Sequence, residues 1–311
     1  MSDSLASAVH ALLRRLHSQR PLRGGSLIVT LFGDALAPRG GVVTLGSLIR
    51  IAAAFRLPER LVRTSVARLA NDGWLVARRE GRQSEYRLAP GGAQRFAEAT
   101  RRIYGAGPAC WGGEWTLMVL AAGVAGAKRE HLRDELRWLG FGQLSPGTFA
   151  HPNCTQEQAR EWARALPGAE EALVLRSSSG KLSVDRQVVS VGWDLGELTR
   201  RYRRFLATFQ PVEAATRGQI DARGALVIRT LLIHEYRKIH LQDPLLPAAL
   251  LPADWVGNAA YELSKRLYSV VFESAEAFLS ATAATVSGPL PAADASAYQR
   301  FTSRASVPGT R

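Results

Sequence analysis

The residues whose chemistry is easiest to interpret lie on one predicted helix, which begins at Pro58 and runs to about Asn71. Proline suits the first turn of a helix, where its missing N–H is not needed, and Gly73 can close the helix in a left-handed conformation. Because successive residues turn by about 100° around a helix, the segment has two faces. The apolar face consists of Leu61, Val62, Ser65, Val66 and Leu69. The opposite face consists of Arg60, Arg63, Thr64, Ala67 and Arg68.

The arginine-bearing face has the donors and the shape to meet DNA. A guanidinium fork matches the O6/N7 edge of guanine and also binds phosphates. The hydroxyl of Thr64 adds a polar contact, and the small Ala67 lets the helix approach closely. Taken alone, the pattern is more typical of an amphipathic surface helix with solvated arginines. The neighbouring segments therefore have to decide between the two interpretations.

Those neighbours favour DNA. Residues 45–55 have apolar positions at helical spacing and end at a break over residues 56–58. After the arginine-bearing helix come a predicted strand over 73–79, a glycine-containing turn over 81–84 and a second strand over 86–88. Helix, turn, helix and basic hairpin follow each other in this order in a winged helix-turn-helix, whose recognition helix enters the major groove. The predicted DNA-binding residues are Arg60, Arg63, Thr64 and Arg68 on the helix, with Arg78, Arg79 and Arg82 on the hairpin for the backbone or minor groove.

The charge of the 311-residue chain is unevenly distributed. The net charge is +13, and residues 1–110 contain 17 arginines against 7 acidic residues, a net +10. A GC-rich genome would explain the use of arginine in place of lysine, but not its concentration at one end. The asymmetry predicts a polyanionic partner for the first third of the chain.

Several other classes of protein are not supported. No signal peptide is visible, and the longest apolar stretches, 116–127 and 225–233, are shorter than the roughly 20 residues that cross a bilayer. Cys110 and Cys154 cannot form a disulfide framework or a four-cysteine zinc site. We therefore expect no membrane association and a reducing cytoplasm.

The length predicts two or three domains. We expect a DNA-binding domain over 1–106, a flexible linker at 105–109, a central domain over 111–192, a helical domain over 194–284 and a disordered tail over 285–311. The expected central elements are strands over 115–121, 140–144, 148–150 and 172–176, with helices over 128–139 and 156–166. This β-α-β-β-α-β order is that of a ferredoxin-like domain, and the expected fold class is α+β. Small nucleases of this fold place an acid at the end of the first strand, and residues 115–121 contain no carboxylate.

Catalytic signals are weak. His151 and Cys154 are three positions apart, but two candidate ligands do not make a metal site. We therefore expect a loop histidine and an incidental thiol. His234, beside Glu235, lies on an apolar helix without a positioned nucleophile, so we expect a core or interface histidine rather than a general base. No metal or cofactor is predicted.

Five blocks of sequence also resemble the PaaX family of phenylacetic acid degradation repressors. They are residues 26–34, 60–69, 115–117, 232–238 and 243–247, and the resemblance runs from about residue 22 to residue 280. It implies a winged helix, a ferredoxin-like domain and a helical carboxy-terminal domain. It also implies a repressor of aromatic-acid catabolic genes that is released from its operator by an aryl-acyl-coenzyme A such as phenylacetyl-coenzyme A. Repressors of this class commonly pair on near-palindromic sites, so a homodimer is expected.

A site for such an effector is less well defined. In residues 195–209 the residues Leu195, Leu198, Tyr202, Phe205, Leu206 and Phe209 share one stripe. Arg200, Arg203 and Arg204 point away from it and could bind the phosphates of an acyl-coenzyme A. A solvated cationic face is the alternative, and residues 229–238 are a competing site. For the whole chain, the alternative to a ligand-released repressor is an enzyme that acts on coenzyme A thioesters or nucleic acid.

Overall fold

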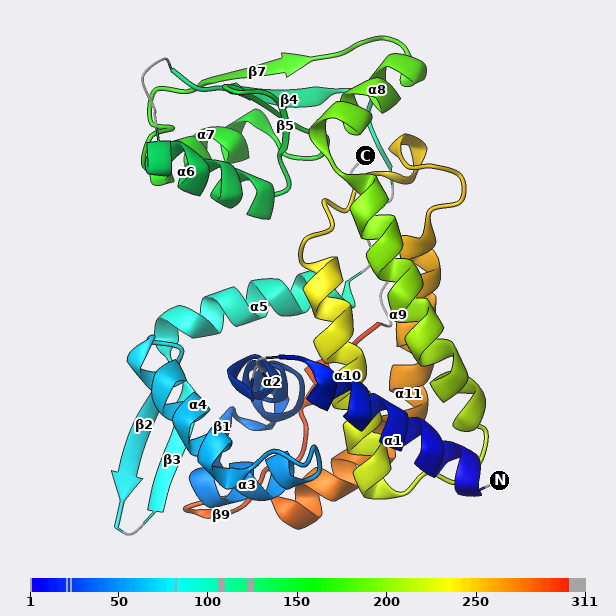
Figure 1. The fold of residues 1–311 in the computed structure, drawn as a ribbon. Helices are drawn as coiled ribbons and strands as arrows, with labels where there is room; N and C mark the ends of the chain where they lie inside the picture. Colours follow the sequence, from blue (N-terminus) through cyan, green and yellow to red (C-terminus); the bar gives the residue numbers. More distant parts are fainter. Residues whose placement is uncertain are drawn as a thin grey trace. The chain divides into compact units, whose positions relative to one another are not determined.

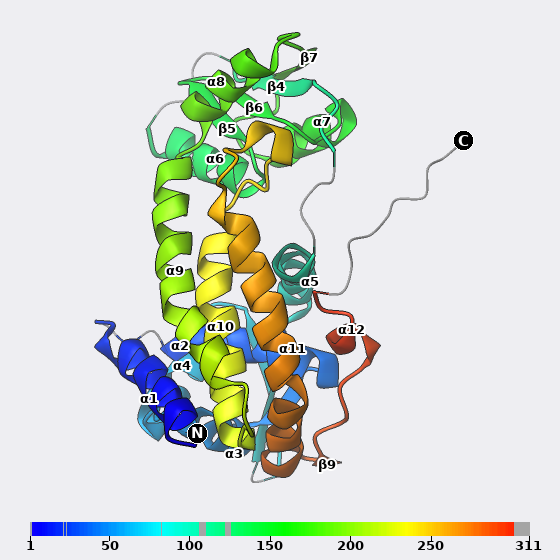
Figure 2. The same ribbon diagram turned by 90° about the vertical axis from the view of Figure 1, so that its right-hand side faces the viewer.

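The structure is a computed structural model, which describes residues 2–20, 22, 24–81, 83–105, 110–121 and 126–301. It is a mixed α+β protein with long helices and small antiparallel sheets (Figures 1 and 2). The chain forms two compact units. The first unit is drawn from Met1–Gly105, Arg203–Lys238 and Asn258–Arg311, and the second from Ala106–Tyr202 and Ile239–Gly257.

The separate helical domain expected over 194–284 is not a compact unit of its own. Its helices α9 (Leu195–Ala215), α10 (Ala222–His240) and α11 (Val256–Thr282) each contribute residues to both units. The burial of α10 gives the physical reason. All residues from 224 to 234 are buried, so no side of this stretch faces water. A helix that is buried all round needs cover on every side, and in the first unit the amino-terminal third of the chain supplies part of it.

The amino-terminal part of the first unit combines short helices with a small sheet. Its elements are α1 (Ser2–Ser18), α2 (Gly24–Leu31), a π-helical turn (Phe32–Leu36), a 3-10 turn (Ala37–Arg39), β1 (Val42–Thr44), α3 (Leu45–Ala53), α4 (Glu59–Asn71), β2 (Leu75–Glu80), β3 (Gln83–Leu88) and α5 (Pro90–Tyr104). The sheet has the order β1-β3-β2, and both pairings are antiparallel. Helices α2 and α3 both pack against α4.

Local chemistry fixes the ends of α3 and α4. Thr44 caps α3, because its Oγ1 accepts a hydrogen bond of 3.2 Å from the backbone N–H of Ser47. Pro58 lies immediately before α4 as its N-cap. At the other end Gly73 has a φ of +73°. The N–H of Gly73 bonds to the carbonyl of Ala70 and that of Trp74 to the carbonyl of Leu69. These two bonds form a Schellman motif, which confirms the predicted left-handed closure.

The tail expected to be disordered over 285–311 is ordered as far as residue 301. Strands β8 (Ala284–Thr285) and β9 (Gly288–Pro289) form a hairpin, and α12 (Ala295–Tyr298) follows it. Figure 2 shows this segment running beside α11. Composition predicted disorder, but a few buried apolar side chains are enough to hold a segment that is otherwise rich in polar and small residues. The ring of Phe301 packs at 5.1 Å from that of Tyr104 and at 5.5 Å from that of Tyr268. Residues 302–311 lie outside the described residues.

The second unit has one four-stranded sheet. Its elements are β4 (Trp115–Val119), α6 (Gly126–Trp138), β5 (Gly142–Ser145), β6 (Thr148–His151), α7 (Gln156–Ala165), β7 (Leu173–Ser177) and α8 (Leu182–Gly192). The strand order is β5-β6-β4-β7, and every pairing is antiparallel. Helices α6 and α7 cover one face (Figure 1). On the other face α8 and the segment 246–251 pack around Trp115. The elements occur in the predicted order, with ends that differ by at most two residues.

Candidate nucleic-acid interface

The structure confirms the two faces that were predicted for α4. Val62, Ser65 and Val66 are buried, whereas Leu61 and Leu69 are partly covered. All five residues of the opposite face, Arg60, Arg63, Thr64, Ala67 and Arg68, are exposed. The side chain of Arg68 is 83% exposed. A helix held by its apolar face and open along its arginine-bearing face can therefore present those guanidinium groups to a partner.

Among the residues that the structure describes, two exposed arginines of α4 pair with carboxylates close to them in sequence. Arg63 pairs with Glu59 one turn earlier at 2.7 Å, and Arg68 lies 3.6 Å from the carboxylate of Asp72. The hydroxyl of Thr64 donates to the carbonyl of Arg60. Surface pairs of this kind contribute about 0–1 kcal/mol, so a phosphate or a base edge can replace them at little cost.

A close approach of α2 sets the position of α4. A Cβ atom on Gly24 would lie 2.9 Å from Oγ of Ser65 and 3.0 Å from Cγ of Leu61. Any larger residue would have to push the two helices apart. The glycine at the start of α2 thus allows the apolar face of α4 to seat directly on the α2 backbone.

The β2–β3 hairpin carries the remaining predicted residues. Arg78 is exposed and pairs with Glu80 at 2.8 Å, and Arg79 is exposed with its Nε 3.4 Å from the carbonyl of Gly81. Because they are consecutive strand residues, Arg78 and Arg79 project from opposite faces of the hairpin. Arg82 lies outside the described residues.

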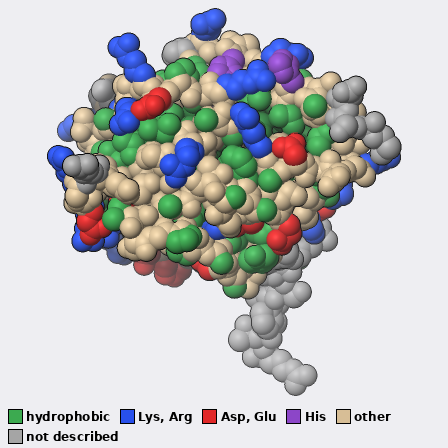
Figure 3. Space-filling model, turned by 90° about the horizontal axis from the view of Figure 1, so that it is seen from below, with side chains coloured by type: hydrophobic (Ala, Val, Ile, Leu, Met, Phe, Trp, Pro, Cys, Tyr) green, Lys and Arg blue, Asp and Glu red, His purple; other side chains and the backbone are tan. Residues whose placement is uncertain are grey.

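The turn between α3 and α4 adds Arg56, which sequence reasoning did not single out. It is exposed and has a φ of +56°, a conformation that is uncommon for residues other than glycine. Its Nη2 lies 3.4 Å from Nδ1 of His10. The one sequence signal was its place at the start of the helix break over residues 56–58. Viewed from below, the molecule shows more basic than acidic side chains, and the basic ones are scattered among apolar and other surface (Figure 3).

Behind this surface lies a buried ionic network centred on Asp34, in the π-helical turn that follows α2. Its Oδ2 accepts from Nε of Arg229 at 2.9 Å, and its Oδ1 accepts from Nη1 of Arg300 at 2.8 Å. The hydroxyls of Tyr104 and Tyr268 donate to the same Oδ1 at 2.6 and 2.9 Å. Burial alone would raise the pKa of Asp34, but Arg229, Arg300 and the two hydroxyls together hold it below its usual value.

The network continues to Glu276 on α11. Arg229 donates to Oε1 of Glu276 at 2.5 Å, and Nε of Arg39 donates to Oε2 at 2.8 Å. Arg39 also donates to the carbonyl of Pro291, in the ordered tail. Three arginines and two carboxylates from distant parts of the sequence thus hold the amino-terminal elements against α10, α11 and the tail.

The two histidines that gave weak catalytic signals each have hydrogen-bond partners within the protein. His234 is buried, and its Nδ1 lies 2.9 Å from Oγ1 of Thr30. Burial, with Lys238 and Arg237 nearby, lowers the pKa of His234 well below its usual value. Nδ1 of His151 accepts from the backbone N–H groups of Asn153 and Cys154 at 2.9 Å each. Within the described ranges no three His, Cys, Asp or Glu side chains are grouped as a metal site.

The predicted effector arginines lie on α9. Tyr202, Phe205 and Phe209 are buried as expected. Arg200, Arg203 and Arg204 are exposed, and Arg200 donates to Oε2 of Glu197 from Nε and Nη2, at 3.0 and 2.8 Å. The competing segment 229–238 is a poorer site, because Arg229 is completely buried and its donors are used by Asp34 and Glu276.

Comparison with known proteins decides the family. Residues 23–92 match the model of PaaX-like proteins, residues 108–189 that of the PaaX central Cas2-like domain and residues 193–281 that of the PaaX-like C-terminal domain. The Transcriptional repressor PaaX of Escherichia coli (strain K12) is 35% identical over 290 residues, which cover 90% of each chain. The chain belongs to the PaaX family. This membership confirms the predicted resemblance and makes the chain a transcriptional repressor rather than an enzyme.

A solved structure shares the fold. The uncharacterized protein Rv0674 from Mycobacterium tuberculosis superposes with a TM-score of 0.53 at 23% identity, over 81% of this chain and 97% of the other. The match to the PaaX-like model begins just before α2 and ends within α5, so it includes α4 and the hairpin. The central domain of this PaaX-family chain is Cas2-like. In the part of the chain that the structure describes, no helix has both the length and the apolar character to span a bilayer.

Proposed function

We propose that this PaaX-family repressor reads its operator with a winged helix-turn-helix formed by α3, α4 and the β1-β3-β2 sheet. The observation that carries the proposal is the exposed arginine-bearing face of α4, opposite a face that is buried against α2 and α3. The order α3, α4, β2, β3, with β1 completing the sheet, is the one a winged helix requires.

Each predicted side chain has a role in this proposal. Arg60, Arg63, Thr64 and Arg68 would meet base edges and phosphates in the major groove. Arg78, Arg79 and Arg82 would meet the backbone or the minor groove, where cationic groups bind with little dependence on sequence. Arg56 would add a phosphate contact at the start of α4. The local pairs of Arg63 and Arg78 with Glu59 and Glu80 would break when DNA binds.

We assign the central unit to the ferredoxin-like folds, because its strand order and antiparallel pairing are those of a split β-α-β sandwich. Its first strand, β4, contains no carboxylate, which removes the acid that nucleases of this fold use. Pairing of two chains on a near-palindromic operator is the expected assembly, in the cytoplasm.

The regulated genes would be those of aromatic-acid catabolism, phenylacetate above all, and the effector an aryl-acyl-coenzyme A such as phenylacetyl-coenzyme A. The family resemblance supports this choice. Arg200, Arg203 and Arg204 on α9 are our proposed phosphate contacts. The ligand can release the operator only by binding the DNA-free conformation more tightly than the DNA-bound one.

Footprinting of the purified chain on its own upstream DNA tests the first part of the proposal. We expect a protected near-palindromic site, and protection that phenylacetyl-coenzyme A removes while free phenylacetate at equal concentration does not. Absence of any protected site would contradict the operator assignment. Release by the free acid would contradict the thioester assignment.

A triple variant tests the phosphate contacts. Alanine at Arg200, Arg203 and Arg204 should leave operator binding intact and abolish the response to the thioester. A matched control replaces Arg129, Arg133 and Arg137 on α6 with alanine, which removes the same charge elsewhere in the chain. A triple variant that responds like the parent would move the phosphate contacts to other residues.

A further inference from the structure

Residues 282–286, at the end of α11 and the start of the β8–β9 hairpin, contact three elements of the proposed winged helix. The segment binds α3 through Ser47, β3 through Glu85 and β1 through Thr44. These contacts span between 201 and 240 positions of the sequence. The 282–286 segment therefore joins the first helix of the motif to the sheet that carries its hairpin. None of the predicted DNA contacts is among these residues.

On α3 the contact is made by Ser47, whose side chain is completely buried. Its Oγ accepts from the N–H of Ala284 at 2.9 Å and lies 3.2 Å from the carbonyl oxygen of the same residue. Arg50 supports this arrangement, because it donates to Oγ of Ser47 at 2.9 Å and to the carbonyl of Thr282 at 3.1 Å. A residue without exposed surface cannot contact DNA itself. Any effect of Ser47 on DNA binding must therefore pass through the elements that it holds.

On the sheet the contact is made by Glu85, which is half-buried in β3. Its Oε1 accepts from the N–H of Val286, and a hydrogen bond to a charged acceptor is about twice as strong as a neutral one. In the register of the sheet Glu85 lies opposite Thr44 of β1. The hydroxyl of Thr44 lies 3.3 Å from the carbonyl oxygen of Ala284. The 282–286 segment thus holds two neighbouring strands at the same level.

A hairpin of this size needs such support. Strands β2 and β3 have six residues each, and β1 pairs with only three residues of β3. A two-stranded hairpin by itself is marginally stable in water. A hairpin that moves must be ordered when it binds DNA, and that ordering weakens the binding. Contacts that fix the hairpin in advance therefore favour the complex.

The charge of Glu85 separates this role from simple electrostatics. Glu85 lies opposite Arg78, one of the predicted DNA contacts, in the register of β2 and β3. A carboxylate at this place lowers the positive potential that attracts DNA. If charge alone mattered, removal of Glu85 would strengthen DNA binding. If the hydrogen bond to Val286 holds the hairpin in place, removal of Glu85 weakens DNA binding.

We propose that Ser47 and Glu85 are positioning residues for operator binding, and that they act by fixing α3 and the β2–β3 hairpin to the 282–286 segment. The end of α11 then belongs to the DNA-binding machinery, although it lies outside the amino-terminal third of the chain. This inference rests on the proposed function, because it takes DNA as the ligand of α4 and the hairpin.

Three carboxylate variants of the full-length chain test the proposal by fluorescence anisotropy with operator DNA. Glu85→Ala removes the acceptor and should weaken operator binding about fivefold, with a slope of log affinity against log salt that is reduced by about one. Glu85→Gln removes the charge but keeps an acceptor oxygen, so it should bind at least as tightly as the parent. Glu80→Ala is the matched control, because Glu80 lies on the same hairpin and pairs with Arg78. It should also bind at least as tightly as the parent.

Ser47→Ala approaches the same segment from α3 and does not depend on Glu85. It should weaken operator binding several-fold, because it removes the contact with Ala284. Its control is Ser264→Ala, at a buried serine of α11 that donates to the carbonyl of Ala260 in its own helix. Circular dichroism shows whether each variant is folded.

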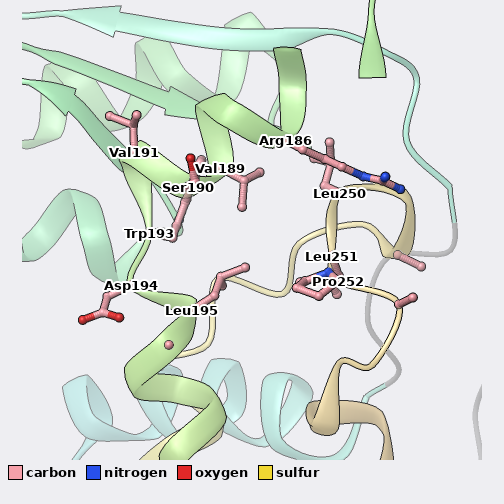
Figure 4. Close-up of a pocket in the computed structure, with 13 residues that line it drawn as sticks. Arg186, Val189, Ser190, Val191, Trp193, Asp194, Leu195, Leu250, Leu251 and Pro252 are labelled. Atoms are coloured by element: carbon pink, nitrogen blue, oxygen red, sulfur yellow. The ribbon is translucent and has the colours of Figure 1, made fainter. Parts of the chain in front are cut away.

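Hydrogen–deuterium exchange of the DNA-free chain measures the hairpin directly. In Glu85→Ala the exchange should rise over β2 and β3, and in Glu80→Ala it should stay parental there. In both variants the exchange should stay parental in the second unit. This includes the segments around its pocket of about 680 Å³, which lies between the end of α8, the start of α9 and residues 248–253 (Figure 4). Exchange that rises throughout the chain would show a general loss of stability and would overturn the positioning role.

The proposal is also overturned if Glu85→Ala binds the operator at least as tightly as the parent, if Glu85→Gln weakens binding as much as Glu85→Ala does, or if Ser47→Ala binds as its control does. A parent that binds no operator would contradict the proposed function. The exchange of the hairpin, which involves no DNA, would still decide whether Glu85 holds it. A parent that binds its operator, with Glu85→Ala equal to it, would contradict this inference alone.

Discussion

The first unit contains two groups of arginines that differ in burial and pairing: those on α4 are exposed, and those in the Asp34 network are buried. On α4 the side chain of Arg63 is 56% exposed and pairs with Glu59 of the same helix, and that of Arg68 is 83% exposed and pairs with Asp72, the residue that follows the helix. In the Asp34 network Arg229 is completely buried and is held by two carboxylates and a backbone carbonyl. The difference teaches that pairing and burial, not residue type, decide whether a positive charge is available to a partner or is needed by the fold.

The energies of the two groups differ accordingly. A surface pair contributes about 0–1 kcal/mol, whereas the loss of one partner from a buried pair costs about 3–5 kcal/mol because the other charge is left buried and uncompensated. Changes in the network should therefore appear in stability. Changes on α4 and the hairpin should appear in DNA affinity, with the fold intact.

The largest effect is expected from Arg229→Met. The variant removes the guanidinium group that pairs with both Asp34 and Glu276, so these two carboxylates stay buried with less positive charge beside them. The free energy of unfolding should therefore fall by about 3–5 kcal/mol. Urea denaturation followed by circular dichroism measures it. Arg68→Met on α4 is the control and should stay within about 0.5 kcal/mol of the parent. Equal stabilities for the two variants would remove the distinction between the two groups.

The next largest effect is expected on the free energy of unfolding at alkaline pH. Burial raises the pKa of Tyr268 from 10.0 to about 12. Because the folded state keeps the proton more tightly, this stabilisation is complete below pH 10 and is lost as pH rises towards 12. The loss should be roughly 2–3 kcal/mol. In Tyr268→Phe the unfolding free energy should fall less between pH 10 and pH 12 than in the parent. In Tyr298→Phe, a change at an exposed site, it should fall as in the parent. Identical pH profiles of unfolding free energy for parent and Tyr268→Phe would contradict the prediction.

On α4 the expected effect is on base recognition. Arg63→Ala should weaken operator binding by about 1–3 kcal/mol if the side chain pairs with a base. Binding to random DNA should fall much less, and the unfolding free energy should hardly change. Fluorescence anisotropy with both DNAs measures the difference, with Arg137→Ala on α6 as the control. Unchanged operator affinity would show that this face of α4 does not read bases.

The smallest effect is expected on the hairpin. Arg79→Ala should weaken operator and random DNA by similar factors and reduce the slope of log affinity against log salt by about one. We expect the same of Arg82→Ala. The measurement is a salt titration of binding, and Arg164→Ala is the comparison. A slope that stays at the parental value would mean that the hairpin does not contact phosphates.

Local pattern predicted much of this molecule. The two faces of α4 follow from helical periodicity, and its closure at Gly73 follows from the conformational freedom of glycine. The order of elements from β4 to β7 was also predicted, because each element carries its own periodicity. Such signals extend over 5 to 15 residues and do not require knowledge of the remaining chain.

The Asp34 network could not be predicted in that way. Asp34 and Arg229 are 195 positions apart, and Asp34 and Arg300 are 266 apart. The apolar residues around Asp34 indicate a buried position, but they do not identify the arginines that pair with it. The ordered tail was missed for a related reason, because Leu290 and Phe301 are isolated apolar residues in a polar segment. The contacts that Ser47 and Glu85 make with residues 284 and 286 likewise become visible only in the folded chain.

The separation between Asp34 and Arg300 has a consequence during synthesis. A ribosome adds about 5–20 residues per second, so the 266 positions between the two residues take about 10–50 s to make. For most of that time the nascent chain has the elements of its DNA-binding segment, but it lacks Arg229 until 195 positions after Asp34 and Arg300 until the end of the interval. The amino-terminal third should therefore reach its final packing only when translation is nearly complete. Premature termination before Arg300 should yield fragments that proteases degrade rather than short repressors that compete for the operator.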